Sequence, residues 1–306
     1  MSSYEDNGSG LPFVFRNGVD LELNKRGRIS ASSLAKMIEK GEFSSQQEHM
    51  LCALKSFSLM TARQLEMLFY VSNMPLRYMR LSSGLGRNLH RKDISYLMRY
   101  GILDQYEMKS GNKKVAPGLY AAAGAVYQQK ALQKIVPVER LVVAGGRNNA
   151  RIRPASCLNY PIALSVLALN QLHIRVLTDF SFLPTAYRAW LTPDVPANIY
   201  QTHDNQYMIA VAPREKPGKR AVEAIINAAI AELCEADHEE AQKKILFVVG
   251  STAYALELNG CLPEEIREQC LYVTDYEIYG GHGLDQLIKV TGAREFDLIA
   301  GMEKDG

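Results

Sequence analysis

The sequence lacks any apolar stretch long enough to cross a bilayer. Its strongest apolar run, Ile245–Val249, ends at Gly250, whereas a membrane-spanning helix needs about 20 apolar residues. The first ten residues, MSSYEDNGSG, also lack the basic segment and the apolar run of a secretory signal. We therefore expect a cytoplasmic protein with no membrane partner.

Cysteine is scarce and scattered. There are 5 cysteines, an odd number, and no C-x-x-C pair occurs among Cys52, Cys157, Cys234, Cys261 and Cys270. This usage predicts reduced thiols and argues against a cysteine-rich zinc site. The sequence also has no repeat of fixed period.

Acidic residues are nearly missing from residues 71–103, where Asp93 is the only one. Residues 1–153 hold 23 Lys/Arg and 12 Asp/Glu, a net charge of +11, and residues 154–306 hold 12 and 21, a net charge of −9; the two sum to the overall +2. The field of the first half attracts a polyanion, and that of the second half repels one.

The first 70 residues predict a hairpin and several helices. Residues 12–16 and 19–23 alternate around Asn17-Gly18, a strong hairpin signal, and residues 32–39 predict a short helix. Two more helices follow, each opened by a capping box, Ser45 with Glu48 and Thr61 with Gln64. Their predicted buried residues are Met50, Leu51, Leu54 and Phe57 in the first helix, and Leu65, Leu68 and Phe69 in the second.

The stretch 87–103, RNLHRKDISYLMRYGIL, predicts a third helix ending near Gly101. Its inner face is predicted to hold Leu89, Ile94, Leu97 and Met98. A strand (102–108), a basic turn KSGNKK and a returning strand (118–122) come next. Three helices followed by a strand, a basic turn and a strand are the order of a winged helix-turn-helix.

Basic residues on this third helix and turn make it a candidate DNA reader. Residues 87, 91, 95 and 99 are spaced by four, so they follow one stripe of a helix, and a cationic outer face opposite an apolar inner face suits a helix in the major groove. Surface helices often carry Lys and Arg, so a solvated face is the alternative. The predicted DNA-binding residues are Arg77, Arg80, Arg87, Arg91, Lys92, Ser95, Arg99, Lys109, Lys113 and Lys114.

The segments LMTARQLEMLFYV, ISYLMRYGILDQYEM and GLYAAAGAVY resemble the replication-relaxation family of plasmids and conjugative elements. The resemblance covers roughly residues 45–130, and the segment YAAAGA lacks the family's Leu-Thr pair. It implies a DNA-binding accessory of replication, transfer or transcription. The residues that fit are Thr61, Gln64, Leu65, Leu97, Gly101, Leu103, Gly118, Tyr120 and Gly124.

The second half alternates helices with strands and predicts an α/β domain with a mixed sheet. We expect helices over 122–135, 160–172, 218–236, 252–260 and 284–292. Strands are expected over 173–180 and 187–191, on both sides of a turn at 203–205, and over 244–250 and 270–278. The predicted division is an N-terminal hairpin and short helix (1–43), a winged-helix DNA-binding domain (44–143), a linker (144–156), an α/β domain (157–299) and a tail (300–306).

The family resemblance also implies a restriction-endonuclease-like core in this half. Active members hold Mg²⁺ with two acids next to a lysine. Here Asp194 follows a proline, but Val211-Ala212-Pro213 occupies the place of the acid-x-Lys motif, and Glu215 and Lys216 follow that proline. A lone Asp is a poor Mg²⁺ ligand set. We therefore predict a degenerate core with no catalytic residue, metal site or cofactor.

These observations predict a non-enzymatic protein that binds double-stranded DNA and forms a homodimer, since many DNA readers are two-fold dimers. The acidic α/β domain is the expected site for a protein partner. The alternatives are a metal-dependent nuclease using Asp194 and a protein-interaction scaffold whose basic face is incidental.

Overall fold

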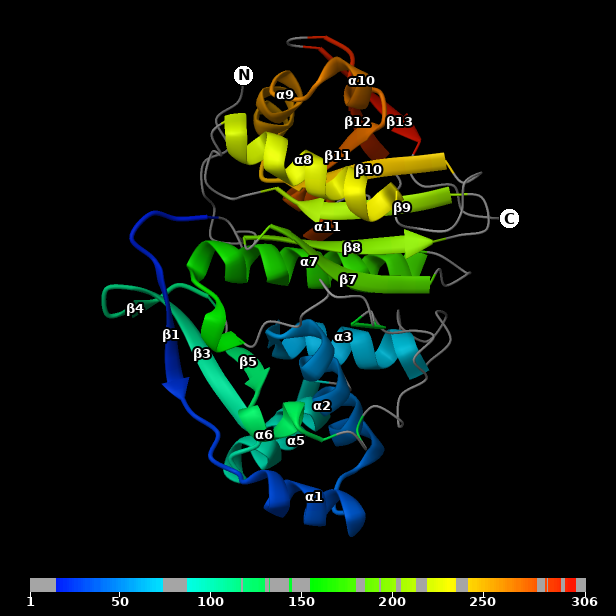
Figure 1. Ribbon diagram of the computed structural model, residues 1–306. Helices are drawn as coiled ribbons and strands as arrows, with labels where there is room; N and C mark the ends of the chain where they lie inside the picture. The colour runs from blue at the N-terminus through cyan, green and yellow to red at the C-terminus, as the bar shows by residue number, and fades with distance from the viewer. Residues whose placement is uncertain are drawn as a thin grey trace.

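The computed structural model (Figure 1) describes most of the chain. The described residues are 15–73, 87–116, 118–129, 132, 143–144, 155–179, 185–192, 194–201, 205–212, 219–234, 242–279, 284, 286–292 and 295–300.

The first half is built on a small antiparallel sheet of five strands in the order β1-β3-β5-β2, with β4 paired to β3. These are β1 (Asp20–Lys25), β2 (Met60–Thr61), β3 (Leu103–Ser110), β4 (Lys113–Lys114) and β5 (Leu119–Ala122). The predicted turn at Asn17-Gly18 exists, with Gly18 at φ 70°. The strand after it pairs with β3. Residues 12–14 of the predicted hairpin lie outside the described residues.

Four helices pack with this sheet: α1 (Ala31–Glu39), α2 (Ser45–Phe57), α3 (Ala62–Asn73) and α5 (Arg87–Arg99). The buried face predicted for α2 is confirmed, because Met50, Leu51, Leu54 and Phe57 are fully buried. The described elements run in the chain order α2, β2, α3, α5, β3, β4 and β5. The predicted helices, strand, basic turn and strand thus occur in the predicted order, with the unpredicted short strand β2 between α2 and α3.

One predicted capping box is confirmed and the other is shifted. The Gln64 side chain accepts a hydrogen bond from the Thr61 amide, and the Thr61 hydroxyl accepts one from the Gln64 amide, both at 3.1 Å. Helix α2 begins one residue earlier than predicted, with Ser44 and Gln47 as the reciprocal pair. The predicted pair of Ser45 with Glu48 is therefore wrong. A capping box accepts either Glu or Gln at the N3 position, so the sequence fits both registers, and the helix uses Gln47.

The second half contains an eight-stranded mixed sheet in the order β13-β12-β11-β10-β9-β8-β7-β6. Strands β9, β10 and β11 run parallel, as do β6 and β7, and the remaining neighbours are antiparallel. The strands are β6 (Val143–Ala144), β7 (Thr185–Thr192), β8 (Val195–Gln201), β9 (Asn205–Val211), β10 (Gln242–Val249), β11 (Cys270–Thr274), β12 (Gln286–Val290) and β13 (Phe296–Ala300). The predicted mixed-sheet α/β architecture is confirmed.

Helices cover both faces of this sheet (Figure 1). Helix α7 (Tyr160–Asp179) packs with the apolar side chains of one face, and α8 (Lys219–Cys234) and α9 (Thr252–Gly260) pack with those of the other. In chain order, α7 is followed by the antiparallel strands β7, β8 and β9, then by α8 and β10. Four short helices complete the described elements: α6 (Gly124–Tyr127), η3 (Ala155–Cys157), α10 (Glu264–Arg267) and α11 (Asp275–Tyr279).

Four predicted elements are wrong in whole or in part. The strand expected over 270–278 ends at Thr274, and the short helix α11 follows it. Residues 173–179 continue helix α7 instead of forming a strand, and both His173 and Ile174 are buried. Residues 286–290 form strand β12 instead of a helix, since Leu287 and Ile288 point to opposite faces of the sheet and enter different cores. The helix expected over 122–135 is, within the described residues, the short α6 (Gly124–Tyr127).

Helix α7 belongs to the core of both halves. The Gln64 side chain on α3 donates to the Leu167 carbonyl at 2.8 Å, and the Asn170 side chain donates to the carbonyls of Phe57 and Leu59. The same apolar cluster contains residues of α2, α3 and α5 together with residues of α7, β9, β10 and β11. One of the apolar clusters in the described part of the chain is therefore shared by the two halves on either side of the predicted linker, residues 144–156, most of which lies outside the described residues.

Asn170 supports a tight turn between α2 and β2. Ser58 has φ 64° and ψ −51°, and the Leu59 amide donates to the Phe57 carbonyl at 2.7 Å, which is the geometry of a rare, strained γ-turn. Ser58 is buried, so its neighbours' carbonyls need partners from the protein, and Asn170 supplies them.

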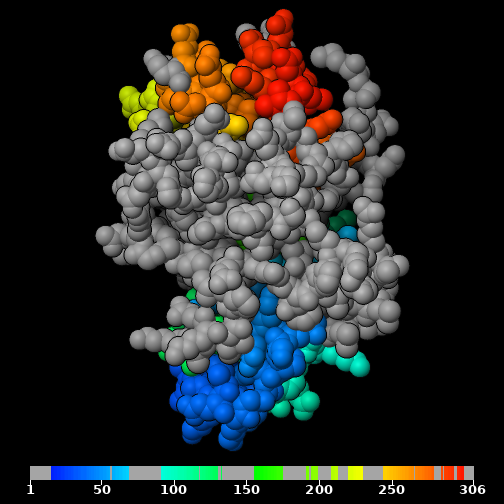
Figure 2. All heavy atoms as spheres, turned by 90° about the vertical axis from the view of Figure 1, so that its right-hand side faces the viewer, coloured from blue at the N-terminus to red at the C-terminus, as the bar shows by residue number. Residues whose placement is uncertain are grey.

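The described elements of the first half lie at one end of the molecule and the C-terminal strands at the other (Figure 2). Among the described residues, no helix has the length and apolar content that crossing a membrane requires.

Candidate nucleic-acid interface

Helix α5 is amphipathic as predicted. Ile94 and Leu97 are buried in the core shared with α2 and α3, and Met98 packs against them. The opposite side exposes Arg91, Lys92, Ser95 and Arg99. The side chains of Leu89 and Arg87 lie outside the described part of the structure, and so do the predicted contacts Arg77 and Arg80.

Asp93, the acidic residue of helix α5, is turned away from the exposed face of the helix. The Asp93 carboxylate accepts a hydrogen bond of 2.8 Å from the Gln47 side-chain amide, whose oxygen accepts from the Ser44 amide at 3.1 Å. Asp93 therefore fastens α5 to the first turn of α2. As a result, the charged side chains on the exposed face from Arg91 to Arg99 are all cations.

An aromatic pair continues this face toward the end of the helix. The rings of Tyr96 and Tyr100 have centroids 4.6 Å apart, and Tyr96 packs edge-on against Phe43. Tyr100 is 46% exposed, which is unusual for a large aromatic side chain, and it follows Arg99 directly. Sequence reasoning missed Tyr100. The signal was its spacing, since residues 92, 96 and 100 follow one stripe beside that of Arg91 and Arg99.

Helix α5 ends in a Schellman motif at the predicted glycine. Gly101 has φ 68°, its amide donates to the Met98 carbonyl, and the Ile102 amide donates to the Leu97 carbonyl. The chain then enters β3 directly, so the turn between β3 and β4 is attached rigidly to α5.

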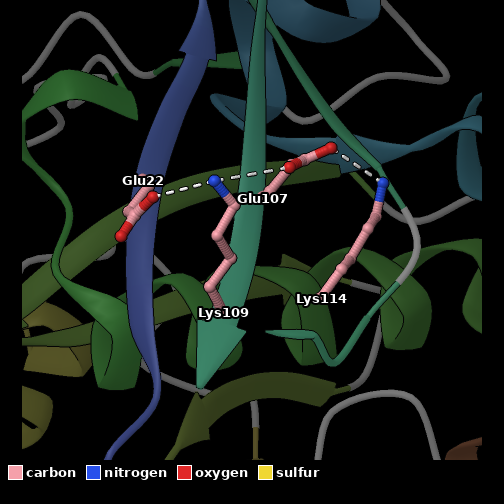
Figure 3. A network of polar contacts seen from close by, with 4 residues as sticks. All are labelled: Glu22, Glu107, Lys109 and Lys114. Atoms are coloured by element: carbon pink, nitrogen blue, oxygen red, sulfur yellow. Dashed lines mark hydrogen bonds and ion pairs between the residues drawn. The ribbon is translucent and has the colours of Figure 1, made fainter. Parts of the chain in front are cut away.

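This turn carries the predicted basic residues, but two of its three lysines are already ion-paired (Figure 3). The Lys109 amine lies 2.9 Å from the Glu22 carboxylate and 3.7 Å from that of Glu107, and the Lys114 amine lies 3.0 Å from Glu107. Lys113 is exposed and forms no ion pair within the described part of the chain. The charge that the turn presents is therefore smaller than its sequence indicates.

The strand register explains these ion pairs. Glu22 on β1 stands directly opposite Glu107 on β3, an arrangement of like charges that is unfavourable unless a cation lies nearby. Lys109 is that cation. The hydrogen bond from Lys114, with the charges of both lysines, lowers the pKa of the Glu107 carboxyl, and the hydrogen bond to Glu22 raises the pKa of Lys109.

A further basic segment, missed in the sequence, lies at the end of α5. Lys25, Arg26 and Arg28 connect β1 to α1 and are all exposed. The run NKRGR, residues 24–28, was the available signal, because short Lys/Arg-rich segments often form nucleic-acid patches.

The predicted metal ligands of the second half do not come together in the described residues. Asp194 is exposed in the turn between β7 and β8, where its amide donates to the Thr192 hydroxyl at 3.4 Å. Ala210, Val211 and Ala212 are buried at the end of β9. Glu215 and Lys216 lie outside the described residues, within which no group of three His, Cys, Asp or Glu side chains is placed to hold a metal ion.

The buried thiols are poorly suited to nucleophilic chemistry. Burial raises the pKa of Cys52 to about 11 and that of Cys270 to about 12, so both remain protonated near neutral pH, and the thiolate is the reactive form. The Cys52 thiol donates to the Leu132 carbonyl at 2.7 Å, which is a packing role.

No protein-family model matches this chain, and no curated protein or solved structure matches it.

Proposed function

We propose that this protein binds double-stranded DNA through helix α5 and acts, without enzymatic activity, as an accessory or regulator of replication, transfer or transcription on a plasmid or mobile genetic element. The observation that carries the DNA-binding proposal is the exposed face of α5. It presents Arg91, Lys92 and Arg99, while Asp93 is directed inward to Gln47.

The elements around α5 support this proposal. The major groove of duplex DNA accommodates an α-helix, and α5 follows two capped helices and precedes a β-hairpin, as in a winged helix-turn-helix. Ser95, exposed between Arg91 and Arg99, is able to donate a hydrogen bond to a phosphate oxygen. In this arrangement Lys113 reaches a neighbouring phosphate, and Lys109 and Lys114 do so only by leaving Glu22 and Glu107.

The eight-stranded sheet has a different role in this proposal. The chain from residue 154 onward has a net charge of −9, from 12 Lys/Arg and 21 Asp/Glu, which disfavours contact with DNA. This half serves self-association into a homodimer or the docking of a protein partner. A dimer matches two DNA half-sites that are related by two-fold symmetry.

The test is the affinity for a random-sequence duplex, measured across a range of salt concentrations. Each phosphate contact contributes about 0.9 to the slope of log K against log salt. Loss of two contacts in Arg91→Ala/Lys92→Ala therefore lowers the slope by about 2 and the affinity at 0.1 M salt by roughly 10- to 100-fold.

A matched control is Arg220→Ala/Lys289→Ala, which removes two cations from α8 and β12 of the acidic half. We expect the affinity of this control to equal that of the wild type. Equal affinities for the α5 variant and the control would exclude α5 as the DNA-binding helix.

Two outcomes would favour the alternatives. Absence of binding in dilute buffer supports the interaction scaffold. Mg²⁺-dependent cleavage that is abolished by Asp194→Ala supports the nuclease.

A further inference from the structure

The segment Lys25–Arg28 carries a compact group of exposed cations, Lys25, Arg26 and Arg28, which we name the basic arm. It begins in the last residue of β1, where Lys25 pairs with Gln105 of β3. It ends before Ser30, the N-cap of α1. Both ends of the basic arm are thus held by regular elements.

The middle of the basic arm is fixed to the C-terminal end of α5. The Ile29 amide donates to the Gly101 carbonyl at 3.1 Å, and the Gly27 amide donates to the Asp104 carboxylate at 2.7 Å. A Cβ on Gly27 would lie 2.6 Å from the Gly101 carbonyl oxygen, and one on Gly101 would lie 3.0 Å from the Arg28 amide nitrogen. The two backbones therefore touch, and Gly101 follows Arg99 by only two residues.

The cations of the basic arm differ from the lysines of the β3–β4 turn in their ion pairing. Within the described residues, none of Lys25, Arg26 and Arg28 forms an ion pair, whereas Lys109 and Lys114 do. The Asp104 carboxylate beside the basic arm is half-buried and accepts a hydrogen bond from the Gly27 amide. Burial raises the pKa of the Asp104 carboxyl. The hydrogen bond from the Gly27 amide and the charge of Arg26 lower this pKa by smaller amounts.

From this juxtaposition we propose that the basic arm is a second DNA-contacting segment, which binds backbone phosphates beyond the C-terminal end of α5. The inference rests on the proposed function and deepens it. The DNA-binding surface then runs from Arg91 and Lys92 through Arg99 to Arg28 and Arg26. Such an arm adds affinity and fixes the position of α5 on the duplex, without reading bases itself.

A structural explanation competes with this one. A cation near the C-terminus of a helix stabilises it through the helix dipole, so Arg28 at the end of α5 could serve stability alone. The two explanations differ in their readout, since a dipole partner changes the unfolding midpoint and a phosphate ligand changes the salt dependence of DNA binding.

The experiment uses the full chain with Arg26→Gln/Arg28→Gln, which keeps an extended polar side chain at both positions and removes both charges. The probe is a random-sequence duplex titrated at several KCl concentrations, and thermal unfolding is followed by circular dichroism. The control is Arg220→Gln/Lys289→Gln, and Arg91→Ala/Lys92→Ala is measured alongside. We expect the basic-arm variant to keep its unfolding midpoint, to lose about 2 from the salt slope, and to bind roughly 10- to 100-fold more weakly at 0.1 M salt.

The outcomes separate the two proposals. A wild-type salt slope in the basic-arm variant, together with a reduced slope in the α5 variant, overturns the inference and leaves the proposed function standing. A lowered unfolding midpoint with an unchanged slope assigns the basic arm to stability and also overturns it. Absence of salt-dependent binding by the wild type overturns both.

Discussion

At the scale of single residues, Gly27 shows how tightly the basic arm is held against α5. A Cβ at this position would lie 2.6 Å from the Gly101 carbonyl oxygen and 2.7 Å from the Ala123 Cβ. Neither neighbour is the mobile end of a side chain, so a larger residue forces the backbone to move. Glycine is required here by close approach, since Gly27 is not among the residues with positive φ.

We therefore predict that Gly27→Ala lowers the free energy of unfolding by about 1–3 kcal/mol, the usual cost of overpacking. Urea-induced unfolding measures this change. Gly124→Ala is the matched control, because nothing lies within 4 Å of a Cβ on Gly124 and this residue begins helix α6. Alanine there is neutral or stabilises by roughly 0.4–1 kcal/mol. Equal effects of the two substitutions would contradict the packing argument.

At the scale of elements, the β3–β4 turn balances its lysines against acids of β1 and β3. Glu107 pairs with both Lys109 and Lys114, whereas the one ion pair of Glu22 among the described residues is with Lys109. These exposed ion pairs contribute little to stability. Their main consequence is that they reduce the positive electrostatic potential at the surface of the turn. A phosphate has to compete with Glu107 for both lysines.

If the turn faces DNA, Glu107→Gln strengthens binding, because the two lysines lose their shared counter-charge. We expect a severalfold gain in affinity at low salt and a smaller gain for Glu22→Gln. The measurement is the same duplex titration, with Glu223→Gln on the exposed side of α8 as the control for a change in net charge. A gain no larger than that of the control would mean that the turn does not contact DNA.

Sequence patterns predicted these elements where the signal is local. The Thr61–Gln64 capping box, the buried residues of α2 and the end of α5 at Gly101 depend on spacings of three or four residues. The pairing of Lys109 with Glu22 could not be predicted, because it joins residues 87 positions apart through the register of β1 on β3. The same holds for the contact of the basic arm with Gly101.

The errors also have a physical cause. Residues 173–179 and 286–290 are short segments of mixed apolar and polar residues, whose pattern fits either a helix or a strand. The tertiary environment decides between the two. Residues 173–179 extend α7 across the sheet, while residues 286–290 pair with β13 and, through Ile288, with β11.

At the scale of the whole molecule, the two sheets share a core instead of forming separate globules. Leu54 on α2 is fully buried in a cluster that continues through α7 to β9 and β10. Hydrogen bonds from Gln64 and Asn170 cross the same boundary. A domain boundary normally has few crossing contacts, so the described residues favour cooperative unfolding of both halves.

Leu54→Ala tests this cooperativity. Removal of a buried leucine side chain costs about 2–5 kcal/mol, and because the core is continuous, the loss must reach the second sheet. Trp190, the single tryptophan of the chain, lies in β7, so its fluorescence reports on that sheet, whereas far-ultraviolet circular dichroism reports on all helices.

We expect both signals to shift to lower denaturant together, in one transition. Leu298→Ala on β13, where the side chain is 60% exposed, is the control that leaves both midpoints nearly unchanged. A Trp190 midpoint that stays at the wild-type value, while part of the helical signal is lost earlier, would show that the basic half unfolds independently. In that case DNA, if it binds α5 as proposed, stabilises only the first sheet. With a shared core, bound DNA raises both midpoints, since a ligand of the folded state stabilises the whole cooperative unit.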